Sequence, residues 1–262
     1  MRCECNTLTK VLAAILLGLL INISQAAPII DNWPIMQSAF FANRVVEEGV
    51  NQIIITAPVQ AEDAALVPVT FELVDDNLQY KWMYVFIDAN PIPLTATLHF
   101  PSNTHHFKLS TRVRLESNSI LRVIAETRSG QLLMASVAIK TAGGGCGGGG
   151  LSDESALRAS AGKMKFKQTA DAMTGIKTVA LNIKHPMRTG FERTAMGYYA
   201  KAWFINRLDL SVDNKPILNA DLGPGISADP YFQFDFTTET GYINIEAKDN
   251  EGKLYQQTFA LN

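Results

Sequence analysis

The residues Trp82-Met83-Tyr84-Val85-Phe86-Ile87, followed at once by Asp88-Ala89-Asn90-Pro91, decide the fold class of this 262-residue chain. The first six residues are aromatic, β-branched or otherwise apolar, and the next four are types that end strands and form turns. A short apolar run that stops at a turn signal is typical of a β-strand. Because the same pattern recurs along the chain, we expect an all-β protein.

Similar runs surround this stretch in the first half of the chain, and each is bounded by turn-forming residues. They are residues 52–56, 67–73, 94–100, 107–115, 121–126 and 132–139. Short strands at this spacing predict an antiparallel β-sandwich. Ahead of them, residues 32–48 predict a short N-terminal helical segment, with Ile35, Phe40, Val45 and Val46 on one apolar face.

The second half repeats the strand pattern. Its apolar runs are residues 164–168, 178–184, 199–212, 231–236, 242–247 and 253–261, of which 199–212 holds one long strand or two. Asp249-Asn250-Glu251-Gly252 predicts a hairpin turn between the last two runs. Phe232, Phe234 and Phe236 alternate with polar residues, which places the three rings in the core. We therefore expect two immunoglobulin-like β-sandwiches, over residues 27–142 and 163–262.

The N-terminus has the three parts of an export signal, and we assign residues 1–26 to a signal peptide. Arg2 and Lys10 are followed by an apolar run over residues 11–21, and Ser24-Gln25-Ala26 supplies the small residues that a signal peptidase reads. The apolar run is shorter than the about 20 residues of a membrane-spanning helix. We expect cleavage after Ala26 and a periplasmic protein without a membrane span.

Composition argues against some partners and ligands. Hydrophobic residues make up 47% of the chain and charged residues 18%, a normal balance for globular cores. The net charge of −2, without a long run of one sign, argues against nucleic-acid binding, which uses a strongly basic face. His99, His105 and His106 are close in sequence, but neighbouring strand residues point to opposite faces, so we expect no metal site there. We also expect no cofactor.

One cysteine requires an explanation. Export removes Cys3 and Cys5 and leaves Cys146 as a single thiol without a partner for an internal disulfide. We interpret residues 143–162 as a flexible arm and linker, in which glycine leaves the chain free and the sulfur unshielded. The arm glycines are Gly143, Gly144, Gly145, Gly147, Gly148, Gly149 and Gly150. Because no Lys, Arg or His adjoins Cys146 in sequence, we expect an ordinary thiol pKa of about 8.5 and activation by a partner.

Three classes of function are compatible with a thiol in such a segment. The first is a covalent carrier that is not itself an enzyme. The second is a thiol enzyme of the sulfurtransferase type, with Cys146 as nucleophile and His185 as base. The surrounding glycines disfavour the second class, because a nucleophile needs a fixed geometry relative to its base. The third is an adaptor that docks a dehydrogenase and never uses its thiol.

Several short motifs resemble a known family. In the first half they are Ala57-Pro58, Ala61-Glu62-Asp63-Ala64, Val67-Pro68-Val69, Asn90-Pro91, Thr111-Arg112-Val113-Arg114 and the Gly-Gly-Cys-Gly-Gly around Cys146. In the second half they are Ile183-Lys184-His185-Pro186-Met187, Thr189-Gly190, Ile226-Ser227, Asp229-Pro230-Tyr231 and Asp249-Asn250 with Gly252. The chain resembles the two subunits of the SoxYZ sulfur-oxidation carrier in one polypeptide, and specifically the quinoprotein dehydrogenase-associated SoxYZ-like carriers.

The resemblance implies a function as well as a fold. It implies sandwiches that pack together and a cysteine, here Cys146, that carries sulfur intermediates covalently in the periplasm. It also implies redox partners, such as a quinoprotein alcohol dehydrogenase or a c-type cytochrome system. In SoxY the cysteine motif ends the polypeptide, whereas here more than a hundred residues follow it. The arm of this chain is therefore expected to be tethered at both ends.

Overall fold

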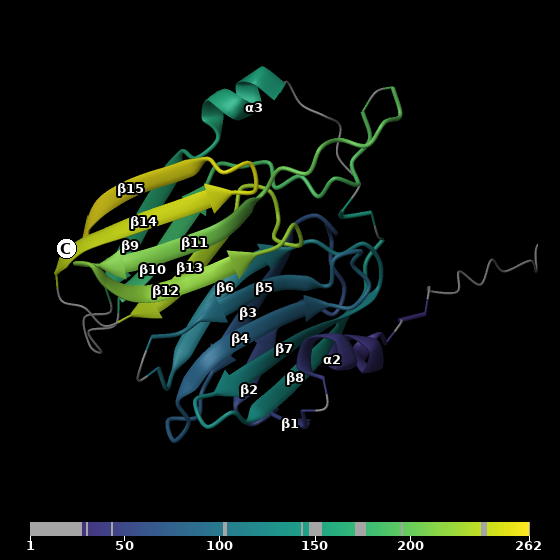
Figure 1. The fold of residues 1–262 in the computed structure, drawn as a ribbon, viewed down its shortest axis with the longest axis vertical. Coiled ribbons are helices and arrows are strands. Elements are labelled where there is room, and N and C mark those ends of the chain that lie inside the picture. The colour runs from purple at the N-terminus through teal and green to yellow at the C-terminus, as the bar shows by residue number, and fades with distance from the viewer. Residues whose placement is uncertain are drawn as a thin grey trace, which may run out of the picture.

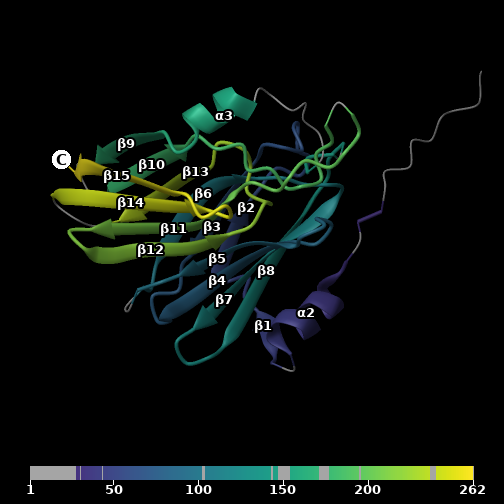
Figure 2. The same cartoon turned by 45° about the horizontal axis from the view of Figure 1, so that its top comes forward.

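The strands of the protein form two sheets that lie face to face (Figures 1 and 2). The computed structural model describes residues 28–29, 31–42, 44–101, 104–142, 144–146, 154–170, 177–194, 196–236 and 240–261. Within them, nine strands form one sheet in the order β1-β8-β7-β4-β5-β12-β11-β14-β15. Six strands form the other sheet in the order β2-β3-β6-β13-β10-β9. The all-β prediction is confirmed.

The elements follow the predicted runs closely. The first half contains α2 (Trp33–Phe41), β1 (Val46–Glu48), β2 (Ile53–Thr56), β3 (Val67–Leu73), β4 (Tyr80–Ile87), β5 (Leu94–His99), β6 (Phe107–Val113), β7 (Ser119–Thr127) and β8 (Leu132–Ile139). The second half contains α3 (Glu154–Ser160), β9 (Met164–Ala170), β10 (Lys177–Ile183), β11 (Ile205–Val212), β12 (Lys215–Leu222), β13 (Tyr231–Phe236), β14 (Gly241–Asp249) and β15 (Leu254–Leu261).

Alternation along the strands builds the core between the sheets. Every second residue of β6 and of β10 is buried, as expected for strands with one face on a core. Phe232 and Phe234 of β13 are buried as predicted, while the side chain of Phe236 lies outside the described part. The predicted hairpin turn between β14 and β15 is also present, with Gly252 at a φ of 90°.

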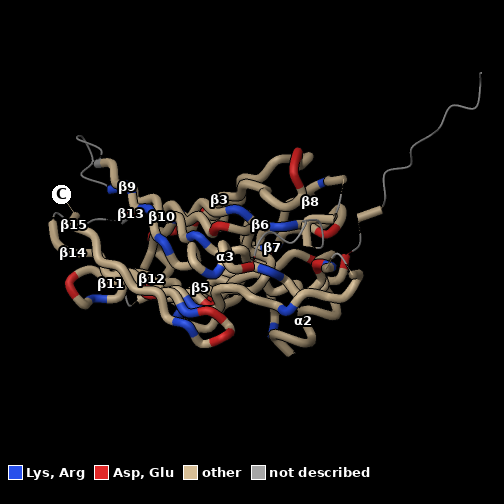
Figure 3. Tube along the Cα trace, turned by 90° about the horizontal axis from the view of Figure 1, so that it is seen from above, with Lys and Arg blue, Asp and Glu red and all other residues tan. Residues whose placement is uncertain are grey.

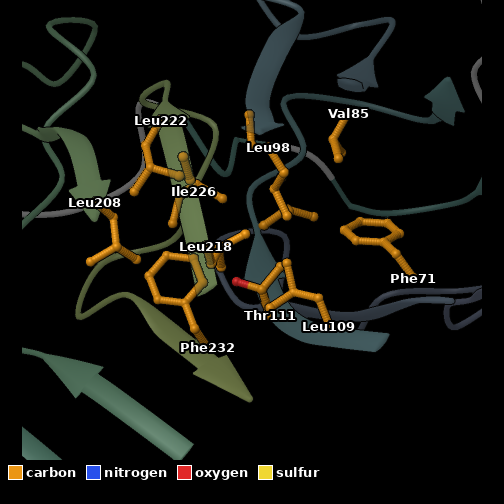
Figure 4. A pocket seen from close by; sticks show the side chains of 13 residues that line it. Phe71, Val85, Leu98, Leu109, Thr111, Leu208, Leu218, Leu222, Ile226 and Phe232 are labelled. Carbon is orange, nitrogen blue, oxygen red and sulfur yellow. The ribbon is translucent and has the colours of Figure 1, made fainter. Parts of the chain in front are cut away.

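The two halves of the chain share both sheets. β5 pairs with β12 in the larger sheet, and β6 pairs with β13 in the smaller one, both antiparallel. We call the junction formed by these two strand pairs the seam. Figure 4 shows the interior at the seam, where Phe71, Leu98 and Leu109 of the first half face Leu218 and Phe232 of the second. One continuous cluster of buried apolar side chains runs through both halves. The halves are thus joined by hydrogen-bonded strands and by a common core.

The N-terminal helix is shorter than predicted and buries a different face. α2 ends at Phe41, and β1 pairs in parallel with β8 where a continued helix was expected. Met36 and Phe41 are buried against the sheet, whereas Ile35 and Val45 are exposed. The predicted short helix is therefore present, but its extension to residue 48 is wrong, because Val46–Glu48 pairs with the exposed edge of β8 as a strand.

Two elements of the second half were not predicted. α3 lies inside the expected linker, where its Arg158 pairs with Glu251 at 2.8 Å and lies 4.4 Å from the centre of the Trp203 ring. β12 follows β11 through a tight turn whose central residues, Asp213 and Asn214, have φ values of 48° and 64°. Positive φ at both central residues is the hallmark of a two-residue hairpin turn, and Asp and Asn tolerate it.

Candidate functional site

The segment that leads to Cys146 runs beside the loop between β6 and β7. The N–H of Gly144 donates to the carbonyl oxygen of Glu116 at 2.9 Å, and the N–H of Gly145 donates to that of Leu115 at 3.1 Å. Gly145 is buried so tightly that a Cβ atom there would lie 2.2 Å from the carbonyl oxygen of Ala64. In this part of the predicted arm, glycine is needed for close packing.

Cys146 itself is buried, with 5% of its surface exposed. Its N–H donates to Oε2 of Glu116 at 3.2 Å, and its carbonyl oxygen accepts a hydrogen bond of 2.8 Å from Oγ1 of Thr189. The expectation that nothing shields the sulfur is therefore wrong for this conformation. The other arm glycines, Gly143 and Gly147 to Gly150, lie outside the described residues.

Both halves of the chain contribute to the walls around Cys146. A small pocket of about 190 Å³ adjoins the cysteine and is lined by Asn90, Pro91 and Ile92 from the first half and by Thr189, Phe191, Pro224 and Gly225 from the second. The walls come from loops at the same end of both sheets, which the seam strands β5, β6 and β12 bring together. The thiol thus sits at the junction of the two halves.

A buried arginine and two glutamates surround this junction. Arg114 donates to the carbonyl oxygens of Met187 and Pro186 at 2.6 and 3.1 Å and lies 3.7 Å from a carboxylate oxygen of Glu192. The Glu192 carboxylate accepts hydrogen bonds from the N–H groups of Thr189 and Gly190, both at 2.9 Å. These contacts hold the loop that carries Thr189 against the first half of the chain.

The surroundings suppress ionisation of the thiol. The pKa of Cys146 is raised to about 12, first by burial and then by the nearby Glu116 carboxylate, while Arg114 opposes the change. At neutral pH the docked sulfur is therefore a protonated thiol and a poor nucleophile. The expectation of an ordinary pKa is wrong because it considered only the residues next to Cys146 in sequence. Arg114, Glu116 and Glu192 are distant from Cys146 along the chain, and the fold brings them close to it.

His185, the candidate base, has other partners. Its Nδ1 accepts a hydrogen bond from the N–H of Met187 at 3.2 Å, and its ring packs edge-on to Trp203 with centroids 4.7 Å apart. Its Nε2 lies 4.0 Å from Asp249, and burial lowers its pKa to about 4. Nothing in the described part of the chain joins His185 to Cys146 by a hydrogen bond.

Of the other histidines, His99 and His106 lie beside acidic side chains, whereas the buried Nδ1 of His105 has no hydrogen-bond partner among the described residues. His99 bonds Asp221 at 2.8 Å across the seam and packs against Trp82, and His106 lies 3.9 Å from Glu72. Across the described ranges, no group of three or more His, Cys, Asp or Glu side chains could hold a metal ion. No helix in those ranges is long and apolar enough to cross a membrane.

Comparison with known proteins divides the chain at the same place. The family model "Sulfur oxidation protein SoxY" matches residues 37–146 and ends on Cys146, and the model "Sulphur oxidation protein SoxZ" matches residues 164–260. Arg114 and Glu116 thus belong to the SoxY part, and Thr189 and Glu192 belong to the SoxZ part. No curated protein matches the chain.

Two solved structures are similar to part of the chain. One is the sulfur carrier protein SoxY from Chlorobium limicola f thiosulfatophilum, with 27% identity, 40% of this chain and 87% of that chain covered, and a TM-score of 0.36. The other is a superoxide reductase (neelaredoxin) from Ignicoccus hospitalis, with 12% identity, 41% and 91% coverage, and a TM-score of 0.28. The assignment rests on the two family models, which match consecutive parts of the chain on either side of residues 147–163. The chain is a fused SoxYZ-like protein, with the SoxY part first and the SoxZ part second.

Proposed function

We propose that this protein is a periplasmic covalent carrier that binds a sulfur-containing cargo on Sγ of Cys146 and presents it to partner enzymes. The observation that carries the proposal is the position of Cys146. It ends the SoxY part, and hydrogen bonds from both parts hold it at their junction through Glu116 and Thr189. Such bonds can be broken and remade at low cost, so the segment can leave its pocket and return.

The thiol has to leave that pocket before it reacts. In the docked position it is protonated, and its charged neighbours include two carboxylates that disfavour a thiolate. In water the same thiol would recover an ordinary pKa and a useful thiolate fraction. This separation of a resting position from a reactive one suits a carrier, which must not react until a partner receives it.

An enzyme using the same thiol would be built differently. A nucleophilic cysteine is activated by a base within hydrogen-bond reach, usually an imidazole that a third group orients. Here the candidate base His185 is committed to Met187 and Trp203. We therefore favour a carrier without catalytic activity of its own over a sulfurtransferase.

The chemistry of loading suggests the class of partner. Joining the Cys146 thiol to a thiol or sulfide sulfur makes one S–S bond and releases two electrons and two protons, so an oxidant must accept those electrons. We propose periplasmic redox enzymes in this role, with a quinoprotein alcohol dehydrogenase or a c-type cytochrome system as the specific possibility to test. Release of the cargo by reduction or hydrolysis would return Cys146 to its pocket.

Intact-mass analysis tests the proposal directly. Protein purified from the periplasm of its own host, without reducing agent, should carry a mass increment that maps to Cys146 and disappears with dithiothreitol. The Cys146→Ser variant should fold, lack the increment and fail to restore function in a deletion strain. A serine variant that restores function fully would refute the carrier and favour the docking adaptor.

A further inference from the structure

A groove on the outer face of the six-stranded sheet shares no lining residue with the thiol pocket. This open groove of about 950 Å³ crosses β3, β6 and the start of β13. Pro58 and Pro68 form part of its walls, Thr56 and Ser110 lie along it, and Arg112 and Tyr231 complete it. Arg112 is the one charged residue among those that line the groove.

Arg112 differs from the other arginines of the structure. Its guanidinium lies 5.0 Å from the centre of the Tyr231 ring, and Tyr231 is itself anchored by a hydrogen bond of 2.6 Å from its hydroxyl to Gln233. Among the described residues, every other arginine side chain forms an ion pair or donates a hydrogen bond, as Arg44 does to Glu126 and Arg128 does to Phe100. Arg112 forms neither with a described residue, so its donors remain available.

The chemistry of the groove favours an anion. A guanidinium presents paired N–H donors in a plane, which match two oxygens of a carboxylate, sulfonate or sulfate group. The contact with the Tyr231 ring, 5.0 Å from its centre, restrains the guanidinium. No carboxylate lines the groove, so nothing there competes for the arginine or repels an anion.

We propose that the Arg112 groove is a non-covalent binding site for a small oxyanion in free solution. Lys165 and Lys167, elsewhere on this face, add a favourable field, whereas Lys108 is paired with Glu72 at 3.5 Å; basic positions are visible around β6 and β10 in Figure 3. The proposal does not depend on the carrier function of Cys146, because the groove shares no lining residue with the thiol pocket.

The two sites nevertheless lie at the same end of β6. Arg112 is followed by Val113, by Arg114 beside the thiol, and by Leu115, whose carbonyl oxygen binds Gly145. Three residues of extended chain span about 10 Å, which is the backbone separation between Arg112 and the residue that binds Gly145.

Side-chain NMR of the full-length mature chain tests the site. We would follow the Arg112 Nε–Hε resonance, and in the parent and every variant also the backbone N–H resonances of the groove residues Ser110 and Tyr231, while adding sulfate, thiosulfate or acetate against chloride at constant ionic strength, in a Cys146→Ser background that excludes covalent adducts. We expect a saturable shift for at least one oxyanion. Arg112→Gln should weaken binding by roughly tenfold or more, as expected for loss of a hydrogen bond to a charged group. Arg112→Lys keeps the positive charge but loses the paired N–H donors of the guanidinium. Its affinity for the oxyanion should lie between those of the parent and of Arg112→Gln.

The control variant is Arg44→Gln, which also removes one positive charge but from an arginine already paired with Glu126. It should bind like the parent, and melting curves should show that the Arg112 variants are folded. Shifts that grow linearly without saturation, or equal losses in Arg44→Gln and Arg112→Gln, would show simple screening and overturn the site. Binding present with Cys146 but absent from the serine background would place the anion at the thiol and overturn it as well.

Discussion

The hydroxyl of Thr189 donates a hydrogen bond of 2.8 Å to the carbonyl oxygen of Cys146, and this bond joins the SoxZ part to the end of the SoxY part. The same Oγ1 lies 3.0 Å from Oε2 of Glu192 and accepts a hydrogen bond of 3.0 Å from the N–H of Phe191. Thr189 is therefore the side chain by which the second half holds the thiol segment in its pocket.

Replacing this hydroxyl should expose the thiol. In Thr189→Val the shape is kept and the bond to Cys146 is lost, so the docked position should weaken by about 1–3 kcal/mol. We expect faster alkylation of Cys146 by iodoacetamide, measured by mass spectrometry over time. Thr258→Val, which removes an exposed hydroxyl bonded to Asn244, is the control and should react like wild type. Equal rates in all three proteins would contradict a restraining role for Thr189.

The alkylation rate should depend on pH in a characteristic way. The pKa of docked Cys146 is raised to about 12, so the docked state holds its proton where a free thiol has lost it. Docking is thus fully favourable below about pH 9 and weakens as the pH rises from there towards 12. The native rate should still be rising at about pH 10, whereas the rate in urea should have levelled off near the pKa of a free thiol. Profiles that level off at the same pH would show that the thiol is not docked in solution.

Gly145 should tolerate no side chain. An alanine Cβ would meet the carbonyl oxygens of Ala64 and Leu115 at 2.2 and 2.6 Å, so Gly145→Ala should displace the segment and expose Cys146. Gly144→Ala is the matched control, because its Cβ meets nothing within 4 Å although its φ of 79° adds strain of about 1 kcal/mol. We expect rapid alkylation in Gly145→Ala and a much smaller change in Gly144→Ala. The reverse order would show that backbone strain, and not packing, controls docking.

The two halves should depend on each other for stability. Separation exposes the edges of β5, β6, β12 and β13 together with the apolar residues of the seam. Residues 27–142 and 163–262 expressed alone should therefore be unstable or aggregate, and should form a soluble complex when refolded together. Size-exclusion chromatography and circular dichroism of each piece and of the mixture provide the measurement. Two stable pieces that fail to associate would contradict the continuous fold.

Export makes a separate prediction about the N-terminus. The basic and apolar residues before Ser24-Gln25-Ala26 predict cleavage after Ala26, so the mature protein should begin at Ala27. N-terminal sequencing of protein from the periplasmic fraction decides the matter. Recovery of a chain that begins at Met1 from the membrane fraction would indicate an uncleaved anchor.

Most strands could be predicted from the sequence, because a strand with one buried face alternates apolar and polar residues. β3 and β10 alternate in sequence as they alternate in burial. β12 was missed because its Lys, Pro, Asn and Asp obscure the alternation, although Asp213-Asn214 was a usable turn signal. The end of α2 was missed because it depends on a strand partner almost ninety residues away, the edge of β8.

The site was predicted less completely than the fold. Cys146 stands out as a single thiol among glycines, but its burial depends on contacts with Glu116 and Thr189, 30 and 43 residues away. A glycine run predicts freedom of the backbone, and only the folded chain shows that Gly145 is there to fit against two carbonyl oxygens. The thiol could therefore be identified from the sequence, whereas its docked and protonated state could not.

The strand pairs at the seam also determine what the covalent connection between the two halves contributes. Because β5–β12 and β6–β13 hold the halves together, a covalent connection between them adds effective concentration to an association that the strands already provide. If the chain were cut shortly after Cys146, these strand pairs would keep the two pieces together, and Cys146 would lie close to a new carboxyl terminus. The uncut and the cut forms would then differ in how freely the segment that bears Cys146 can move. They would differ as well in the depth of the partner active site that its sulfur could enter.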